Sequence, residues 1–269
     1  MDRREADILG RVLGRTVDRA EPGCAESDRI PPGYLAALGR CPGIVLVDKP
    51  AGRTSHDVID RIRSHLRKRM GKGAPRRGPK TGHSGTLDPA ATGLLLVGLG
   101  LGTKLLPYLH GLGKSYRATV RLGVRTETDD LEGEIVGDVI DDPAVSPEAL
   151  EQALGRFRGE FRQAAPRYSA IKRGGRPDYS RARAGEDFEP AVRQVEISRL
   201  ELARFDGREA VLELDCSAGT YVRSLARDIG EVLAVGGTLA ALRRTAIGPF
   251  SLEHALGLDE LGTIALAET

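Results

Sequence analysis

The stretch GHSGTLDPAATGLLLVGLG, residues 82–100, places one carboxylate, Asp88, between a glycine-rich turn and a long apolar run. The run GLLLVGLG is typical of a buried strand that begins a few residues after the acid. Asp-Pro often forms a turn in which the carboxylate accepts backbone N–H groups. Gly82, Gly85 and Gly93 would also let another backbone or a ligand approach closely. A lone carboxylate can act as a nucleophile if another group keeps it ionised and oriented.

The composition indicates an ordinary globular protein. The 269 residues are 40% hydrophobic and 29% charged, and they can bury one substantial core. No apolar run approaches the roughly 18 residues of a membrane span, and the first residues, MDRREADILG, do not suggest export. Cys24, Cys41 and Cys216 lack zinc-like spacing and are odd in number. We expect a cytoplasmic protein with no membrane association, no disulfide framework and no metal.

Charge is unevenly distributed along a chain whose net charge is only +2. Residues 61–80, RIRSHLRKRMGKGAPRRGPK, contain nine Lys or Arg and no acid, whereas acids concentrate in residues 126–142. The basic run could be a solvated helix face and loop. It could also contact phosphates, because clustered cations neutralise a nucleic-acid backbone and release its counterions.

The hydrophobic patterns predict an irregular mixture of helices and strands, which indicates the α+β class. Strands are predicted in residues 43–52, 115–124, 195–205 and 209–219, the last two forming a hairpin. Helices are predicted after Thr54 or Ser55, from Ser146, near Thr220, and in a short segment that Thr238 caps and that contains Leu242. We expect an N-terminal extension in residues 1–41, a compact domain in 42–250 with a basic insertion at 67–80, and a short tail in 251–269.

Three further side chains each allow two interpretations. Arg223, in the first turns of a predicted helix, could pair with Asp88 in the interior or with Asp228 on the surface. Tyr116 could be an ordinary strand aromatic, or it could stack on a base extruded from an RNA helix. His83 could lie in a surface turn, or it could fill the place of a flipped base.

Six segments, in order over about residues 43–250, resemble the bacterial tRNA pseudouridine-55 synthases, the TruB group. They are GIVLVDKPAGRTSHDV, GHSGTLDPAATGLLLV, KSYRATVRLGVRTETDDLEG, PRYSAIKRGGRPDYSRARAGE, CSAGTYVRSLARDIG and ALRRTAIGPF. The resemblance implies a mixed, largely antiparallel sheet with flanking helices and a central RNA-binding cleft. It implies an enzyme that flips uridine 55 out of the T-loop of tRNAs and isomerises it to pseudouridine. This reaction exchanges no atoms with a second substrate, so no cofactor is expected.

The same resemblance assigns roles to individual residues. Asp88 would be the nucleophile, Tyr116 the aromatic stacked on the target base, and Arg223 the ion-pair partner of the aspartate. Asp88 could attack the anomeric carbon or the pyrimidine ring, or abstract a sugar proton, and Tyr116 is a candidate base for the final proton loss from carbon 5. The residues expected on the substrate side are His83, Lys49, Lys104, Tyr221 and Leu242, with Lys49 and Pro50 supporting the core below the site.

The expected partner is the T-arm stem-loop of tRNA, bound by a monomer without a protein partner. Members of the group usually continue into an RNA-binding module of the PUA type, and the short tail after residue 250 predicts its absence. Two other functions stay open: an RNA-folding chaperone, and a guide-RNA-directed synthase resembling the dyskerin group, whose motif also reads GHSGTLDP.

Overall fold

The computed structural model describes residues 43–69 and 80–260. The extension expected in residues 1–41, most of the basic insertion and the last nine residues lie outside the described residues. The domain boundaries expected from the sequence therefore stay predictions.

One mixed sheet of ten strands forms the frame of the molecule, in the order β12-β1-β3-β10-β4-β9-β8-β5, with β2 paired to β3 and β11 to β10. Two of its pairings are parallel, β1 with β12 and β3 with β10, and the others are antiparallel. The strands are β1 Gly43–Lys49, β2 Thr81–Ser84, β3 Thr92–Leu99, β4 Lys114–Leu122, β5 Gly159–Ala164, β8 Val192–Phe205, β9 Glu209–Cys216, β10 Gly237–Ile247, β11 Phe250–Ser251 and β12 Leu256–Gly257.

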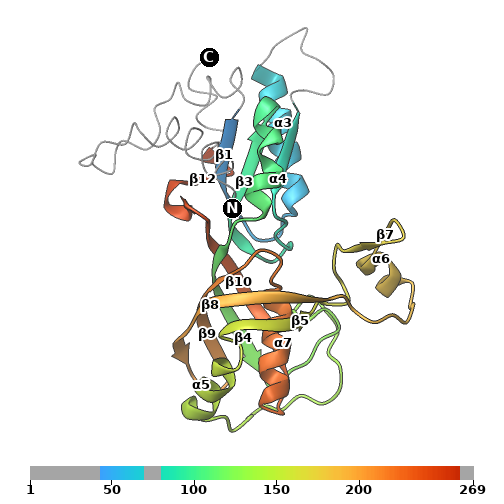
Figure 1. Ribbon diagram of the computed structural model, residues 1–269, viewed down its shortest axis with the longest axis vertical. Helices are drawn as coiled ribbons and strands as arrows, with labels where there is room; N and C mark the ends of the chain where they lie inside the picture. Colours follow the sequence, from blue (N-terminus) through green and yellow to red (C-terminus); the bar gives the residue numbers. More distant parts are fainter. Residues whose placement is uncertain (1–42, 70–79, 261–269) are drawn as a thin grey trace, which may run out of the picture.

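Helices flank this sheet at both ends of the long axis of the molecule (Figure 1). They are α3 Ser55–Arg69, α4 Leu106–His110, α5 Pro147–Gly155 and α7 Val222–Val232, with the 3₁₀ turns η1 Gly100–Lys104 and η2 Leu252–His254. A small unit of β6 Lys172–Arg173, β7 Arg176–Pro177 and α6 Asp178–Arg183 projects to one side in Figure 1. The architecture confirms the predicted α+β class with a largely antiparallel sheet.

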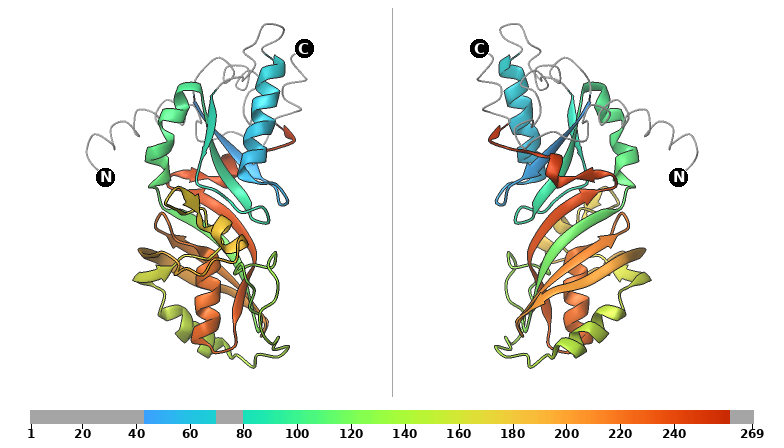
Figure 2. Two further views of the ribbon diagram at one scale, coloured as in Figure 1. Left: turned by 90° about the vertical axis from the view of Figure 1, so that its right-hand side faces the viewer. Right: turned by 90° about the vertical axis from the view of Figure 1, so that its left-hand side faces the viewer.

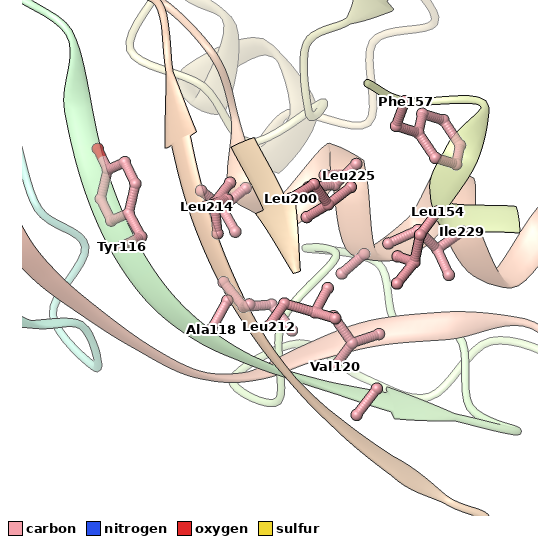
Figure 3. Packing of buried hydrophobic residues seen from close by; sticks show 14 of the residues in the cluster. Tyr116, Ala118, Val120, Leu154, Phe157, Leu200, Leu212, Leu214, Leu225 and Ile229 are labelled. Atoms are coloured by element: carbon pink, nitrogen blue, oxygen red, sulfur yellow. The ribbon is translucent and has the colours of Figure 1, made fainter. Parts of the chain in front are cut away.

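The sheet divides into two lobes that β10 joins, and the side views of Figure 2 show the same division. We call β1, β2, β3, β12, α3 and α4 the first lobe, and β4, β5, β8, β9, α5 and α7 the second lobe. The second lobe holds the largest apolar cluster, in which Leu225 and Ile229 of α7 and Leu154 of α5 pack on Leu200 and Leu212 of the sheet (Figure 3). Two smaller clusters fill the first lobe.

Most predicted elements form for the reasons that the sequence suggests. Before α3, Thr54 and Asp57 each accept the other's backbone N–H, at 3.0 and 2.7 Å, which is a capping box. The hydroxyl of Ser146 accepts the N–H of Ala149 ahead of α5. In the predicted hairpin, the side chain of Asp206 accepts the N–H groups of the turn between β8 and β9.

The prediction of a short helix after Thr238 is wrong, because Thr238 and Leu242 lie in strand β10. This strand pairs with β4 along its whole length and with β3 at its centre. The hydroxyl of Thr238 does not cap a helix but hydrogen-bonds that of Thr126. Pairing on both sides satisfies the backbone of β10 and outweighs the local preference for a turn of helix. No helix in the described residues has the length and apolar character of a membrane span.

Candidate active site

The turn between β2 and β3 carries Asp88 to the boundary of the two lobes. Leu87 and Ala91, on either side of it, are buried in the apolar cluster of the second lobe. The N–H of Ala91 donates to the carbonyl of Asp88 at 3.1 Å, which closes the turn. The side chain of Asp88 remains 41% exposed. The fold thus anchors the backbone around this carboxylate while leaving its oxygens accessible to a ligand.

The structure brings Arg223 to this carboxylate. Arg223 lies in the first turn of α7, and its Nε is 3.0 Å from Oδ2 of Asp88. The alternative surface pair of Arg223 with Asp228 does not form, because Asp228 pairs with Arg227 at 2.8 Å. An arginine bound in this way fixes the orientation of the carboxylate.

The guanidinium of Arg223 is itself held on all sides. Its Nη1 donates to the carbonyl of Thr128 at 2.8 Å and lies 3.7 Å from Oδ2 of Asp130, and its Nη2 donates to the carbonyl of Tyr168 at 3.1 Å. The side chain is only 8% exposed. Because each nitrogen has a partner, the guanidinium presents Nε to Asp88 in one orientation.

Sequence reasoning did not single out Thr128, Asp130 or Tyr168. Thr128 and Asp130 reach the site because the loop after β4 docks on β10, where the N–H of Leu239 donates to the carbonyl of Asp129, whereas Tyr168 lies in the segment that follows β5. The backbone φ of Asp129 is +61°, in the left-handed region that few residues other than glycine adopt. In the sequence, the acid-rich segment TETDDL, residues 126–131, could have indicated Thr128 and Asp130.

Lys49 lies beneath the turn and not at its surface. Its side chain is fully buried, and its Nζ donates to the carbonyls of Pro50, Arg53 and Pro89 at 3.0, 2.6 and 3.1 Å. Burial lowers the pKa of the amine, while the negative charge of Asp88 opposes this shift. Lys49 therefore ties the end of β1 to the turn that carries Asp88.

Tyr116 and Leu242 lie close together where β4 and β10 pair. Leu242 is opposite Ala118 and Arg244 is opposite Tyr116, so the Tyr116 ring is diagonal to Leu242. Figure 3 shows the ring on the border of the apolar cluster. Burial raises the pKa of the phenol, and the positive charge of Arg244 works against that rise. The hydroxyl is therefore protonated at neutral pH.

Tyr221 and His83 are half-buried. Tyr221 precedes α7, and its backbone N–H and C=O are both bonded by the side-chain amide of Gln163, at 2.8 and 3.1 Å. Its ring lies 5.5 Å from the guanidinium carbon of Arg193. His83 is in β2, where burial and the nearby His110 lower its pKa, so the imidazole is neutral at physiological pH.

Lys104 lies beyond the end of β3. It is exposed at the end of η1, which packs against Gly98. Gly98 is near the far end of β3, about 20 Å along the strand from Thr92. Asp88 precedes Thr92, so the structure does not bring Lys104 to the ion pair. No group of three or more potential ligand side chains within the described residues is arranged to hold a metal ion.

Family models place the protein in the class of pseudouridine synthases. A family model described as the TruB family pseudouridylate synthase N-terminal domain matches residues 71–222, more than half of the chain. A model of the tRNA pseudouridylate synthase B C-terminal domain matches residues 223–269.

Named relatives agree with the family match. The chain is 46% identical over 225 residues to tRNA pseudouridine synthase B of Arthrobacter sp. (strain FB24), covering 81% of this chain and 70% of that protein. It is 46% identical over 231 residues to the protein of the same name from Mycobacterium tuberculosis (strain ATCC 25618 / H37Rv), covering 84% and 73%. The chain therefore belongs to the TruB family of pseudouridylate synthases, which confirms the resemblance seen in its sequence.

Solved structures show the same fold. A chain of a Cbf5-Nop10-Gar1 complex superposes with a TM-score of 0.61 at 29% identity, over 89% of this chain and 60% of that chain. A chain of an H/ACA RNP bound to a substrate RNA containing 2'-deoxyuridine gives a TM-score of 0.59 at 26% identity, over 89% and 59%. This protein therefore spans about three fifths of the length of these two solved chains.

Proposed function

We propose that this pseudouridine synthase isomerises uridine 55 in the T-loop of tRNAs, with Asp88 as its nucleophile. The observation that carries the proposal is the ion pair of Asp88 with Arg223. The carboxylate is partly exposed, and the other two nitrogens of the guanidinium are hydrogen-bonded to backbone carbonyls. Isomerisation needs a carboxylate that is ionised and fixed in direction, yet accessible to a nucleotide. The family membership and the named relatives support tRNA as the substrate.

The neighbouring side chains support the stages of this reaction. A flipped uracil would stack on Tyr116 and contact Leu242, which lie diagonally across two paired strands. The protonated phenol of Tyr116 suits this stacking role better than that of a ready base. Asp88 would attack the anomeric carbon or the pyrimidine ring, or remove a sugar proton, and each route begins from the same carboxylate.

Flipping a nucleotide out of its stack costs a few kcal/mol, and contacts between the protein and the phosphates of the RNA must offset this cost. Arginines of the projecting unit are candidates for phosphate contacts, since Arg176 and Arg183 are exposed. The basic face of α3 offers further cations at Arg67 and Lys68. Cations of this kind favour RNA through counterion release. His83, Tyr221 and Lys104 are proposed on the substrate side, and we infer a monomer that acts in the cytoplasm without a protein partner.

Incubation of the purified protein with unmodified T-arm RNA tests the proposal, with any pseudouridine mapped by chemical labelling. Modification at position 55 alone is expected. Asp88→Asn should abolish this modification and leave RNA binding intact, because the amide keeps the shape of the side chain but is not a nucleophile. Unmodified RNA after incubation with the wild-type protein would refute the proposal.

The same experiment addresses two other candidates. An RNA-folding chaperone would keep its effect on RNA structure in Asp88→Asn without needing turnover. A guide-RNA-directed synthase is the second candidate, because the H/ACA RNP is among the similar structures. Activity on bare T-arm RNA, without guide or partner, would exclude it.

A further inference from the structure

Arg244, in the centre of β10, is a buried cation without a carboxylate partner. It is the largest of the fully buried side chains and is 1% exposed. None of the ion pairs within residues 43–69 and 80–260 includes it. A buried charge is costly unless its N–H groups are bonded, and even then an apolar side chain is often as stable. Such a cation is therefore a candidate for a role other than stability.

Its hydrogen bonds reach both sides of Asp88. The Nε of Arg244 donates to the carbonyl of Leu94 at 2.7 Å, and its Nη2 donates to the carbonyl of Gly85 at 3.1 Å. Gly85 precedes Asp88 and Leu94 follows it. One guanidinium therefore fixes both arms of the turn that carries the carboxylate.

The same residue also faces Tyr116. Arg244 and Tyr116 are paired across β10 and β4, and the guanidinium lies against the phenol. On its other side, the backbone of Arg244 pairs with Gly93 of β3, at the junction of the two lobes. Arg244 is thus in direct contact with the turn of Asp88, with the aromatic ring and with the strand pair that joins the lobes.

We propose that Arg244 is a positioning residue, which sets the separation and orientation of the Asp88 carboxylate and the Tyr116 ring around the flipped uridine. This inference rests on the proposed function of the site. The guanidinium is too deeply buried to meet the substrate, so it acts through Gly85, Leu94 and Tyr116. A displacement of roughly 1 Å in a catalytic group can cost about 100-fold in rate.

The test measures chemistry and RNA binding separately in Arg244→Met. Single-turnover release of tritium from T-arm RNA labelled at carbon 5 of uridine reports the isomerisation, and filter binding gives the Kd. We expect the single-turnover rate to fall by about 100-fold while the Kd stays unchanged. Arg199→Met is the matched control, because Arg199 also makes several polar contacts, to Asp215 and Glu201, on strands away from the turn. Its rate should equal that of the wild type.

Two variants separate positioning from mere support of the fold. Arg244→Lys keeps the charge but not the planar fork, so it should show the same loss of rate with an unchanged Kd. In Arg244→Ala, millimolar guanidinium should restore part of the rate by occupying the vacated space. Urea, which has the same shape without the charge, should restore less.

The results for the Arg244 variants decide whether Arg244 is a positioning residue. This role is overturned if the folded variants keep the wild-type rate, if rate and Kd are lost together, or if no variant at position 244 folds by thermal melting. If the wild-type protein itself releases no tritium, the proposed function fails as well. An active wild type with equally active variants refutes the positioning role alone.

Discussion

Asp88, in a turn between two strands of the first lobe, meets Arg223 of the second lobe through an Nε–Oδ2 contact of 3.0 Å. The aspartate lies in the turn before β3, whereas the arginine lies at the start of α7. Their contact therefore depends on how the two lobes are joined.

Arg223→Lys should lower activity by about 100-fold with little change in RNA affinity. A lysine ammonium cannot bond Asp88, Thr128 and Tyr168 together in the planar geometry of a guanidinium. Single-turnover rates and binding constants on the same RNA measure the effect. Arg227→Lys, which alters the next arginine along the same helix, should cost less, and an equal loss in both variants would count against a specific role for Arg223.

Replacement of Tyr116 should distinguish stacking from proton transfer. The burial that raises the pKa of the phenol keeps it protonated, so it is poorly suited to act as a base. Tyr116→Phe should retain most of the isomerisation rate, and Tyr116→Ala should lose about 10-fold or more, since stacking on a base is worth about 1–3 kcal/mol. A Phe variant as inactive as the Ala variant would show instead that the hydroxyl takes part in proton transfer.

Asp129 should make stability depend on pH. Burial raises its pKa to about 6, above the ordinary value of 3.8, although Arg227 opposes the shift. Between these values the folded state binds more protons than the unfolded state. The stabilisation from this group is therefore complete below pH 3.8 and is lost as the pH rises through about 6.

Asp129→Asn removes this titration, and Asn also tolerates the left-handed φ of +61° at this position. The free energy of unfolding of the variant relative to the wild type should increase between pH 4 and pH 7, by on the order of 2 kcal/mol. Denaturant unfolding across this pH range gives the difference. A difference that stays constant with pH would mean that Asp129 does not titrate there.

Gly93→Ala should destabilise the junction of the lobes. Gly93 has a φ of +102°, and a Cβ there would overlap the carbonyl of Arg244 on β10. We expect a loss of more than about 2 kcal/mol in the free energy of unfolding. Gly155→Ala is the control, because nothing lies within 4 Å of its added methyl group at the end of α5. That variant should be neutral or slightly more stable, and a similar loss in both would contradict the steric argument.

Local sequence patterns predicted most of the helices and strands correctly, and the segment around Leu242 is the exception. The helix α5 and the hairpin of β8 and β9 depend on caps and turn residues that are adjacent in sequence, so they were predicted correctly. The segment around Leu242 was not, because its strand conformation is stabilised by β3 and β4, which come from much earlier in the chain. Lys104 illustrates a related limit: its exposed position after the end of β3 follows from the length of that strand, which the motif does not convey.

The sequence by itself determined the family, through six ordered motifs, and the α+β class, through hydrophobic period and turn chemistry. It also identified Asp88 and Arg223 as candidates, because a carboxylate and a guanidinium can form an ion pair that orients the carboxylate. Only the tertiary structure decided that they touch, that Lys49 is enclosed by carbonyls, and that Arg244 connects the turn to Tyr116. Contacts of this kind join segments more than a hundred residues apart in several cases, and they exist only once the strands that carry them have paired.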